Sequence, residues 1–135
     1  MTQEQKTLLI RDLCARLPYG VKCTYYDKYT GEEEQGTITG IQNNTYFVID
    51  GVCIDVENVK PYLFPISSMT KEQKNEWNRW KHMIPVCHYE YGDVVDELEL
   101  WDSPESFQYL IENNFDCNDL IPLGLAEDAT GLNIY

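Results

Sequence analysis

Basic residues are missing from the last 54 residues of the chain, from His82 to Tyr135, which contain twelve aspartates and glutamates. The first 81 residues hold all ten basic side chains against eleven acids, so the formal net charge of −13 divides into −1 and −12. Such negative charge disfavours direct binding to DNA or RNA, whose phosphates it repels. The same charge also keeps a protein soluble, so by itself it names no function.

Motifs for catalysis, metal binding and nucleotide binding are also missing. The eight glycines are scattered singly, so the chain has neither a G-x-G-x-x-G turn nor a P-loop. Cys87 and His88 are adjacent, but their spacing from His82 and Cys117 matches no zinc motif. A Cys-His nucleophile pair would need an orienting group from elsewhere in the fold. We therefore predict a protein that is not an enzyme and uses no metal and no cofactor.

Targeting and membrane signals are absent as well. The N-terminus lacks the basic segment and apolar stretch of a secretory signal, and no run approaches the roughly 18 apolar residues of a membrane span. We expect a cytoplasmic protein without membrane association. The five cysteines are Cys14, Cys23, Cys53, Cys87 and Cys117. Because they are odd in number and widely spaced, we expect reduced, buried thiols rather than a disulfide framework.

The length and composition predict a single folded domain, since 135 residues with 43% apolar content can bury a core. A helix is predicted from Thr2 to about Leu17, because Thr2 and Gln5 form a capping box at its start. Its buried stripe is predicted to comprise Leu9, Ile10, Leu13, Cys14 and Leu17, with Lys6, Arg11, Asp12 and Arg16 largely elsewhere.

Short β-branched and aromatic runs predict a meander of four strands. The runs are Val21–Tyr26, Thr37–Ile41, Tyr46–Ile49 and Val52–Val56. A long polar loop with a glutamate-rich, solvated tip, Asp27–Gln35, is expected after the first strand, and Asp50-Gly51 is a hairpin signal. A fifth strand around Val59–Leu63 would lie at an edge, because Pro61 lacks a backbone donor. Together these features predict a small SH3-like barrel over residues 21–64.

The remaining residues, 65–135, are predicted to form an acidic and mainly helical region. Two helices in it begin at capping hydroxyls; they run from Thr70 to about Met83 and from Ser103 to about Asn114. Residues 120–126 are apolar and are expected to pack. Residues 89–101 combine helical spacing with strand-like alternation, so both structures stay open. The predicted fold class is α+β: an N-terminal helix, a barrel and a helical acidic region.

Three parts of the chain carry distinctive strings: RDLCARLPYGV at residues 11–21, VKPYL running into SSMT at residues 59–70, and FD, LI and GLA between residues 115 and 126. These strings resemble a family of small proteins common in gut Bacteroidales genomes and in their phages and prophages. The family brings no known activity. The resemblance therefore implies a context, namely an accessory protein of a phage or mobile element in a bacterial cytoplasm.

The acidic region suggests a binding face for a protein partner that is basic or handles nucleic acid. The candidate residues are Asp93, Asp96, Glu97, Glu99 and Asp102. In its extreme form, carboxylates on such a face stand in for the phosphates of DNA. The expected function is that of a non-enzymatic protein that binds and blocks a host defence factor through this face.

Tyrosines suggest a second interface. Tyr25, Tyr26 and Tyr29 flank the first loop, where SH3-like barrels present ligand contacts. Because side chains alternate along a strand, one of Tyr25 and Tyr26 should be buried and the other exposed. The exposed tyrosine is the candidate for partner binding.

Two other functions stay open, as does the oligomeric state. A sponge for a nucleotide signal would need basic residues that converge on a pocket; the candidates are Lys22, Lys28, Lys60 and Arg79. A structural adaptor without a ligand would show scattered acids and a buried aromatic set. Tyr62, Phe64, Trp77 and Trp80 could form an exposed surface that stacks on a base or a peptide, but aromatics at helical spacing are expected in the core.

Overall fold

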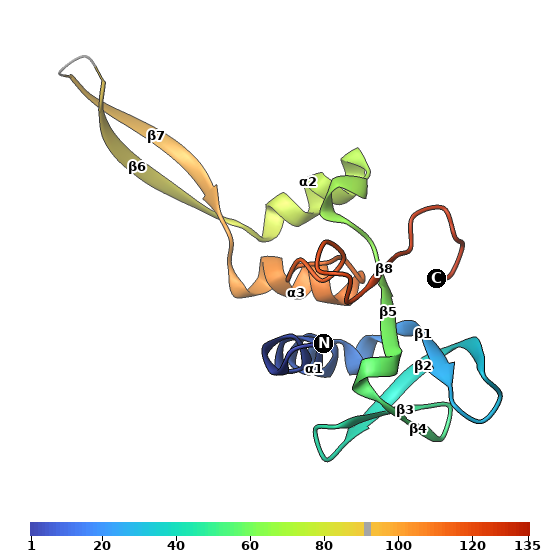
Figure 1. Cartoon of the computed structure of the whole chain (residues 1–135). Coiled ribbons are helices and arrows are strands. Elements are labelled where there is room, and N and C mark those ends of the chain that lie inside the picture. Colours follow the sequence, from blue (N-terminus) through green and yellow to red (C-terminus); the bar gives the residue numbers. More distant parts are fainter. Residues whose placement is uncertain (91–92) are drawn as a thin grey trace. The chain divides into compact units, whose positions relative to one another are not determined.

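The computed structural model describes residues 1–90 and 93–135, and for residues 83–90 and 93–99 it describes the backbone alone. The chain has a mixed α+β fold that begins with a helix, as predicted (Figure 1). Its residues divide into two compact units, Met1–Ser68 with Ile111–Tyr135, and Met69–Leu110. That the whole chain folds as a single domain stays a prediction.

The first unit is built on a six-stranded sheet. Its elements are α1 (Gln3–Arg16), β1 (Lys22–Asp27), β2 (Glu32–Gln42), β3 (Tyr46–Ile49), β4 (Val52–Asp55), β5 (Val59–Leu63) and β8 (Glu127–Asp128), with short 3₁₀ turns η1 (Leu17–Tyr19), η2 (Val56–Asn58) and η3 (Ile66–Ser68). The strand order is β4-β3-β2-β1-β5-β8, and every pair is antiparallel except β5 with β8. The four-strand meander is therefore confirmed.

The sheet is not closed into a barrel, so the SH3-like barrel predicted for residues 21–64 is wrong in that respect. Strand β4 lies at one edge, and β5 pairs with β1 instead of β4. The outer side of β5 is occupied at Tyr62 and Leu63 by β8. Pro61, one residue earlier, has no backbone donor for a further strand. The expected edge position of β5 is wrong for the same reason, since β8 extends the sheet beyond it.

The first hairpin is shorter in its turn and longer in its strands than predicted. Register between β1 and β2 continues to the pair Asp27 and Glu32, so Glu32, Glu33 and Glu34 lie in a strand rather than at a loop tip. The Asp27 side chain accepts a hydrogen bond from the Tyr29 backbone at 2.8 Å, and the Asp27 carbonyl accepts one from Gly31. These bonds fix a tight turn with a positive φ of 72° at Gly31.

Strand β2 bends because it pairs with two different strands along its length. Its first half pairs with β1 and its second half with β3, and the register with β3 shifts between Ile38 and Gly40. A Cβ atom at Gly36 would lie 2.5 Å from the Ile49 side chain and 2.6 Å from Asp50. The absence of a side chain at Gly36 thus lets the end of β3 approach β2.

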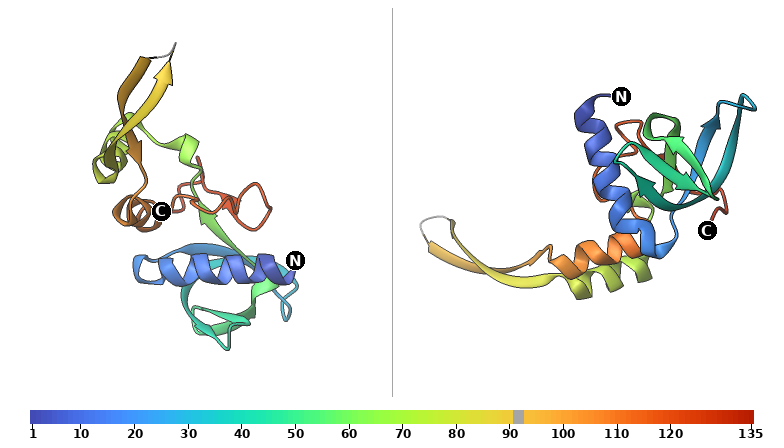
Figure 2. Two further views of the ribbon diagram at one scale, coloured as in Figure 1. Left: turned by 90° about the vertical axis from the view of Figure 1, so that its left-hand side faces the viewer. Right: turned by 90° about the horizontal axis from the view of Figure 1, so that it is seen from below.

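Helix α1 packs along one face of the sheet (Figure 2). Its capping box is confirmed, and Leu9 and Leu13 are completely buried in the core with strand residues. Two details of the prediction are wrong: Asp12 and Arg16 are buried, whereas Cys14 is exposed. The two charged residues tolerate burial because they pair with each other one helical turn apart.

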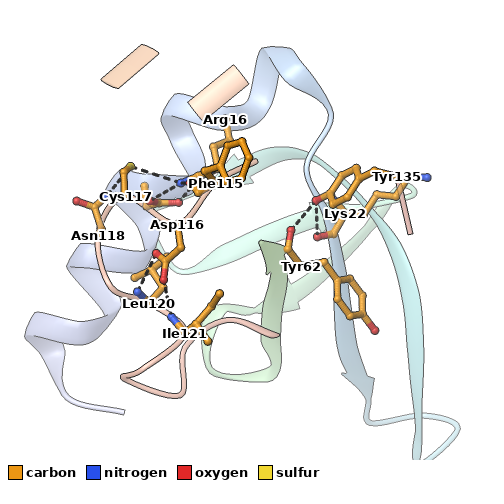
Figure 3. Close-up of polar contacts among 11 residues, drawn as sticks. Arg16, Lys22, Tyr62, Phe115, Asp116, Cys117, Asn118, Leu120, Ile121 and Tyr135 are labelled. Carbon is orange, nitrogen blue, oxygen red and sulfur yellow. Dashed lines mark hydrogen bonds and ion pairs between the residues drawn. The ribbon is translucent and has the colours of Figure 1, made fainter. Parts of the chain in front are cut away.

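This ion pair fastens the segment that follows the last helix of the chain to α1 (Figure 3). Arg16 Nε donates to Asp12 Oδ1 at 2.6 Å, and Arg16 Nη2 donates to the Phe115 carbonyl at 2.7 Å. Asn118 Nδ2 donates to the second Asp12 oxygen at 2.7 Å. Asp116 accepts from the backbone of Leu120. Of the run 120–126, which was predicted to pack, Leu120, Leu125 and Ala126 are buried, whereas Leu123 is 48% exposed.

The last residue forms a polar bridge inside the sheet (Figure 3). Antiparallel pairing of β1 with β5 ends at Cys23 and Pro61. One residue further, the Tyr135 hydroxyl accepts a hydrogen bond from the Lys22 backbone at 2.9 Å and donates one to the Tyr62 carbonyl at 2.7 Å. The phenol thus satisfies two backbone groups that the ladder leaves open.

The second unit holds α2 (Lys71–Trp80), β6 (His82–Glu90), β7 (Asp93–Trp101) and most of α3 (Pro104–Glu112). The capping box at Thr70 and the cap at Ser103 are confirmed. Strands β6 and β7 form an antiparallel hairpin, and α2 ends at Trp80 instead of the predicted Met83. The mainly helical region predicted for residues 65–135 is therefore wrong in part. Helices α2 and α3 form, but residues 82–90 and 93–101 form strands, which is one of the two structures left open for residues 89–101.

No helix in the described part of the chain is long and apolar enough to cross a membrane.

We predict that replacing Arg16 alone strongly destabilises the protein. Arg16→Met leaves the buried Asp12 carboxylate without its cation, which should lower the free energy of unfolding by about 3 to 5 kcal/mol. The double variant Asp12→Leu/Arg16→Met removes both charges and should recover most of this loss. Urea denaturation of the four proteins in the cycle measures both values. A double variant as unstable as Arg16→Met would show that the hydrogen bond to Phe115, rather than charge pairing, dominates.

We also predict a stabilising role for the Tyr135 hydroxyl. Tyr135→Phe should cost about 1 kcal/mol at neutral pH, because two backbone groups lose their partner. Burial is the main cause that raises the Tyr135 pKa from 10.0 to about 12. This residue's contribution is then complete below pH 10 and is lost as the pH rises through 12, because the unfolded chain ionises first. Denaturation of the unaltered protein and of Tyr135→Phe at pH 7 and pH 11 tests this. Tyr29→Phe, at an exposed position, is the control and should leave the free energy of unfolding unchanged.

Candidate functional site

The two tyrosines of β1 lie on opposite sides of the sheet, as alternation predicts. Tyr25 is 9% exposed and its hydroxyl donates to Glu34 Oε2 at 3.1 Å, whereas Tyr26 is 44% exposed. Desolvation, followed by the hydrogen bond and charge of Glu34, raises the pKa of Tyr25. Tyr26 is therefore the tyrosine that is available to a partner.

Tyr26 lies where two surface hollows of the first unit adjoin, and Asn58 also lines both. The larger hollow, about 330 Å³, is lined by Tyr26, Asp27, Lys28, Tyr29, Tyr46, Cys53, Ile54, Asp55 and Asn58. The smaller hollow, about 150 Å³, is lined by Thr24, Tyr25, Tyr26, Glu33, Glu57, Asn58, Lys60 and Glu127. We call the two hollows together the Tyr26 groove, with an aromatic lobe and an acidic lobe.

The aromatic lobe is lined by three tyrosines that the fold leaves open to solvent. Tyr29, in the β1–β2 turn, is 98% exposed, and Tyr46, at the start of β3, is 40% exposed. Both are held by local backbone geometry: the Asp27 side chain accepts from the Tyr29 amide, and positive φ angles at Asn43 and Asn44 form the turn before Tyr46. Exposed tyrosines with fixed backbones are typical of surfaces that bind other proteins.

The acidic lobe gives the groove its charge. Over both lobes, five carboxylates face two lysines; they are Asp27, Glu33, Asp55, Glu57 and Glu127 against Lys28 and Lys60. Asp27 and Asp55 accept hydrogen bonds from backbone amides. Two further carboxylates lie in ion pairs, since Lys60 lies 3.7 Å from Glu127 and Lys6 lies 3.1 Å from Glu57. Both pairs are exposed, so they hold these carboxylates only weakly. The groove is therefore suited to a cationic side chain.

The cysteines differ from their predicted state. Cys23 is buried, and desolvation raises its pKa to about 12. Cys14 and Cys53 are exposed and Cys117 is partly exposed, so the expectation of buried thiols is wrong for these three. All four are free thiols. The Cys53 thiol lies in the aromatic lobe, where it donates to Gln42 Oε1 at 3.0 Å.

The predicted acidic face lies in the second unit. Asp93, Asp96, Glu97 and Glu99 all belong to β7, and their side chains lie outside the described part of the structure. Asp102 follows β7; one of its carboxylate oxygens is 4.0 Å from Lys81 Nζ. The side chains of Cys87 and His88, considered above for metal binding, are likewise outside the description. The described side chains contain no cluster of three or more potential metal ligands.

The basic residues considered for a nucleotide pocket are partly engaged within the protein. Lys22 donates to the Ile134 carbonyl at 2.8 Å and lines a different hollow from Lys28 and Lys60. Lys60 pairs with Glu127, and Arg79 belongs to the other unit. In the first unit, the three lysines therefore do not converge on one pocket.

Of the four aromatic residues expected in the core, some are buried and others are exposed. Tyr62 is buried and Phe64 is partly buried against Phe115, with ring centroids 6.1 Å apart. In the second unit Lys81 Nζ lies 3.5 Å from the centre of the Trp77 ring, and Trp80 is 49% exposed. The core prediction thus fails for Trp80.

Sequence reasoning missed Tyr46, Cys53 and Glu57 as groove residues. They come from β3, β4 and η2, and only the bend of β2 brings these elements close to the β1–β2 turn. A distinctive signal was present at Tyr46, an aromatic residue directly after the polar turn at Asn43 and Asn44.

No family model, curated protein or solved structure matches this chain.

We predict that Cys53 in the groove is alkylated much faster than Cys23 in the core. At pH 8, iodoacetamide should modify Cys53 readily, because its thiol is exposed. Cys23 should resist modification until the protein unfolds, because it is buried and has a pKa of about 12. Peptide mapping by mass spectrometry follows each site over time, with the exposed Cys14 as a second reactive reference. Equal rates at Cys23 and Cys53 in the folded protein would contradict the structure.

Proposed function

We propose that this chain is a non-enzymatic binding protein whose Tyr26 groove holds an extended segment of a partner protein. The segment contains proline next to a lysine or arginine. The observation that carries this proposal is the position of Tyr26, an exposed aromatic ring at the junction of an aromatic and an acidic hollow.

The aromatic lobe supports a proline-containing ligand. Grooves lined by exposed aromatic rings bind polyproline II segments, because flat rings pack against the proline rings and the ligand is already extended. Tyr26, Tyr29 and Tyr46 supply such rings. Because a preformed helix loses little conformational entropy on binding, a shallow groove suffices for measurable affinity.

The acidic lobe supports a basic residue beside the proline segment. Glu33, Glu57 and Glu127 outnumber Lys60 in this lobe. Exposed ion pairs contribute only about 0 to 1 kcal/mol each, so the charge sets orientation and association rate more than affinity. Most of the binding energy must then come from the tyrosines, and we expect dissociation constants in the micromolar range.

The proposal also includes the biological setting in which the protein acts. The resemblance to proteins of gut Bacteroidales and their phages supports an accessory protein that acts in a bacterial cytoplasm and blocks a host defence factor. A groove for a basic, extended segment is compatible with that role. The nucleotide sponge receives less support, because Lys22 and Lys60 contact the protein itself.

We predict that a peptide with a proline-rich core and one arginine binds the groove and protects Cys53. The peptide Ala-Pro-Pro-Leu-Pro-Pro-Arg should slow alkylation of Cys53 severalfold and leave Cys14, on α1, unaffected. Tyr26→Ala should weaken binding about tenfold or more by calorimetry, because it removes the central ring. Leu132→Ala, an exposed residue that lines another hollow, is the matched control.

The same assay distinguishes the contribution of charge to peptide affinity from that of the tyrosine rings. Replacing the peptide arginine by glutamate should weaken binding most at low salt. A peptide that protects Cys53 equally well in Tyr26→Ala, or that binds with unchanged affinity after scrambling of its prolines, would contradict the groove as the site.

A further inference from the structure

Strand β4 (Val52–Asp55) forms a free edge of the six-stranded sheet (Figure 1). It pairs with β3 on one side, from Ile49 with Val52 to Tyr46 with Asp55. No strand of the described chain pairs with its other side. A free edge presents backbone N–H and C=O groups without partners. The ladder with β3 determines which residue of β4 presents them.

The ladder leaves the backbone of Cys53 open. In an antiparallel pair, residues bonded to the partner strand alternate with residues whose N–H and C=O point away from it. The two-residue turn 50–51 has positive φ at both positions and closes on Val52, which is therefore bonded to β3. Val56 has the same phase, because its N–H donates at 3.0 Å to the Thr45 carbonyl just before β3. Cys53, one residue after Val52, thus directs its N–H and C=O to the free edge.

The free edge borders the aromatic lobe of the Tyr26 groove. Three consecutive residues of β4, Cys53 to Asp55, line this lobe, whereas β3 contributes only Tyr46. A hollow above one face of a strand would be lined by alternate residues, because side chains alternate. Consecutive residues therefore place the lobe along the edge of β4, on the side away from β3. A segment that packs against Tyr26 in this lobe then lies beside the open backbone of Cys53.

We infer that the partner segment pairs with β4 through its backbone while its prolines contact the tyrosine rings. One residue of the segment donates its N–H to the Cys53 carbonyl, and a carbonyl of the segment accepts from the Cys53 N–H. The donating residue is not proline, because proline has no backbone N–H. The inference rests on the proposed function and narrows its ligand to a proline segment that is interrupted by another residue.

Pairing with β4 is compatible with a proline-rich ligand. A polyproline II segment has no internal hydrogen bonds, so its carbonyls and any N–H of a residue other than proline stay available. Strand β4 has only four residues, and short edges resist pairing with long strands. An exchange of two hydrogen bonds at Cys53 needs no longer edge. The short edge therefore favours a local contact with a short segment over pairing with another sheet.

The test uses the full chain and three forms of the peptide Ala-Pro-Pro-Leu-Pro-Pro-Arg. One is unmodified, one is methylated at the leucine backbone nitrogen and one at the arginine backbone nitrogen. In both modified peptides the methyl group follows a proline, so charge and added bulk are equal, but only the first lacks the N–H inside the proline segment. Methylation at the leucine should weaken binding about tenfold by calorimetry, and methylation at the arginine by less than about twofold. An ester at the leucine, which removes the N–H without adding a methyl group, should also weaken binding severalfold.

Amide hydrogen exchange followed by NMR locates the pairing on the protein. In the free protein the Cys53 amide should exchange quickly and the Ile54 amide slowly, because only the Ile54 N–H is bonded to β3. The unmodified peptide at saturation should slow exchange at Cys53 at least about tenfold and leave Ile54 unchanged.

The outcomes separate this inference from the proposed function. Equal affinities of all peptides, each lost in Tyr26→Ala, would overturn pairing with β4 and leave the groove as the binding site. Absence of binding, or binding that does not depend on Tyr26, would overturn both. A Cys53 amide that is already protected without peptide would show that the chain itself or a second copy occupies the edge, and would overturn the inference whatever the affinities are.

Discussion

The buried pair of Asp12 and Arg16 is the interaction on which the first unit depends. It joins α1 to Phe115 and Asn118, which lie 99 and 106 positions later in the chain than their partners Arg16 and Asp12. Moving two charges out of water costs several kcal/mol per ion, and their pairing offsets this cost without a large surplus. In addition, Arg16 Nη1 has no hydrogen-bond partner among the described residues. Its main effect is therefore positional. It fixes where the returning chain lies, and β8 and the Tyr135 bridge follow from that placement.

The groove is a consequence of the same open sheet. Strand β2 bends to pair with β1 and then β3, and β8 occupies the side of β5 that a closed barrel would need. The β1–β2 turn and the β4–η2 corner consequently line one hollow around Tyr26. Glu127, which belongs to β8, supplies a carboxylate to the acidic lobe. The strand that extends the sheet beyond β5 thus also contributes to the charge of the site.

Local signals in the sequence predicted local structure well, and they failed where distant segments meet. The capping boxes at Thr2 and Thr70, the turn at Asp50 and the alternation of Tyr25 with Tyr26 depend on neighbouring residues only, and the structure agrees. The burial of Arg16 depends on Phe115 and Asn118, which no spacing rule connects to α1. Closure of the sheet was mispredicted because the pairing of β8 with β5 involves only two residues on each strand, too few to leave a pattern.

The negative charge of the Tyr26 groove favours cations, but charge alone would discriminate only weakly among basic proteins. Exposed ion pairs contribute little net free energy and weaken with salt, so negative charge mainly excludes nucleic acid and speeds the approach of basic proteins. Selection among those proteins must come from shape. In the groove it comes from three tyrosine rings, which favour proline. A partner must then present a proline segment beside its basic residue, a far narrower requirement than positive charge.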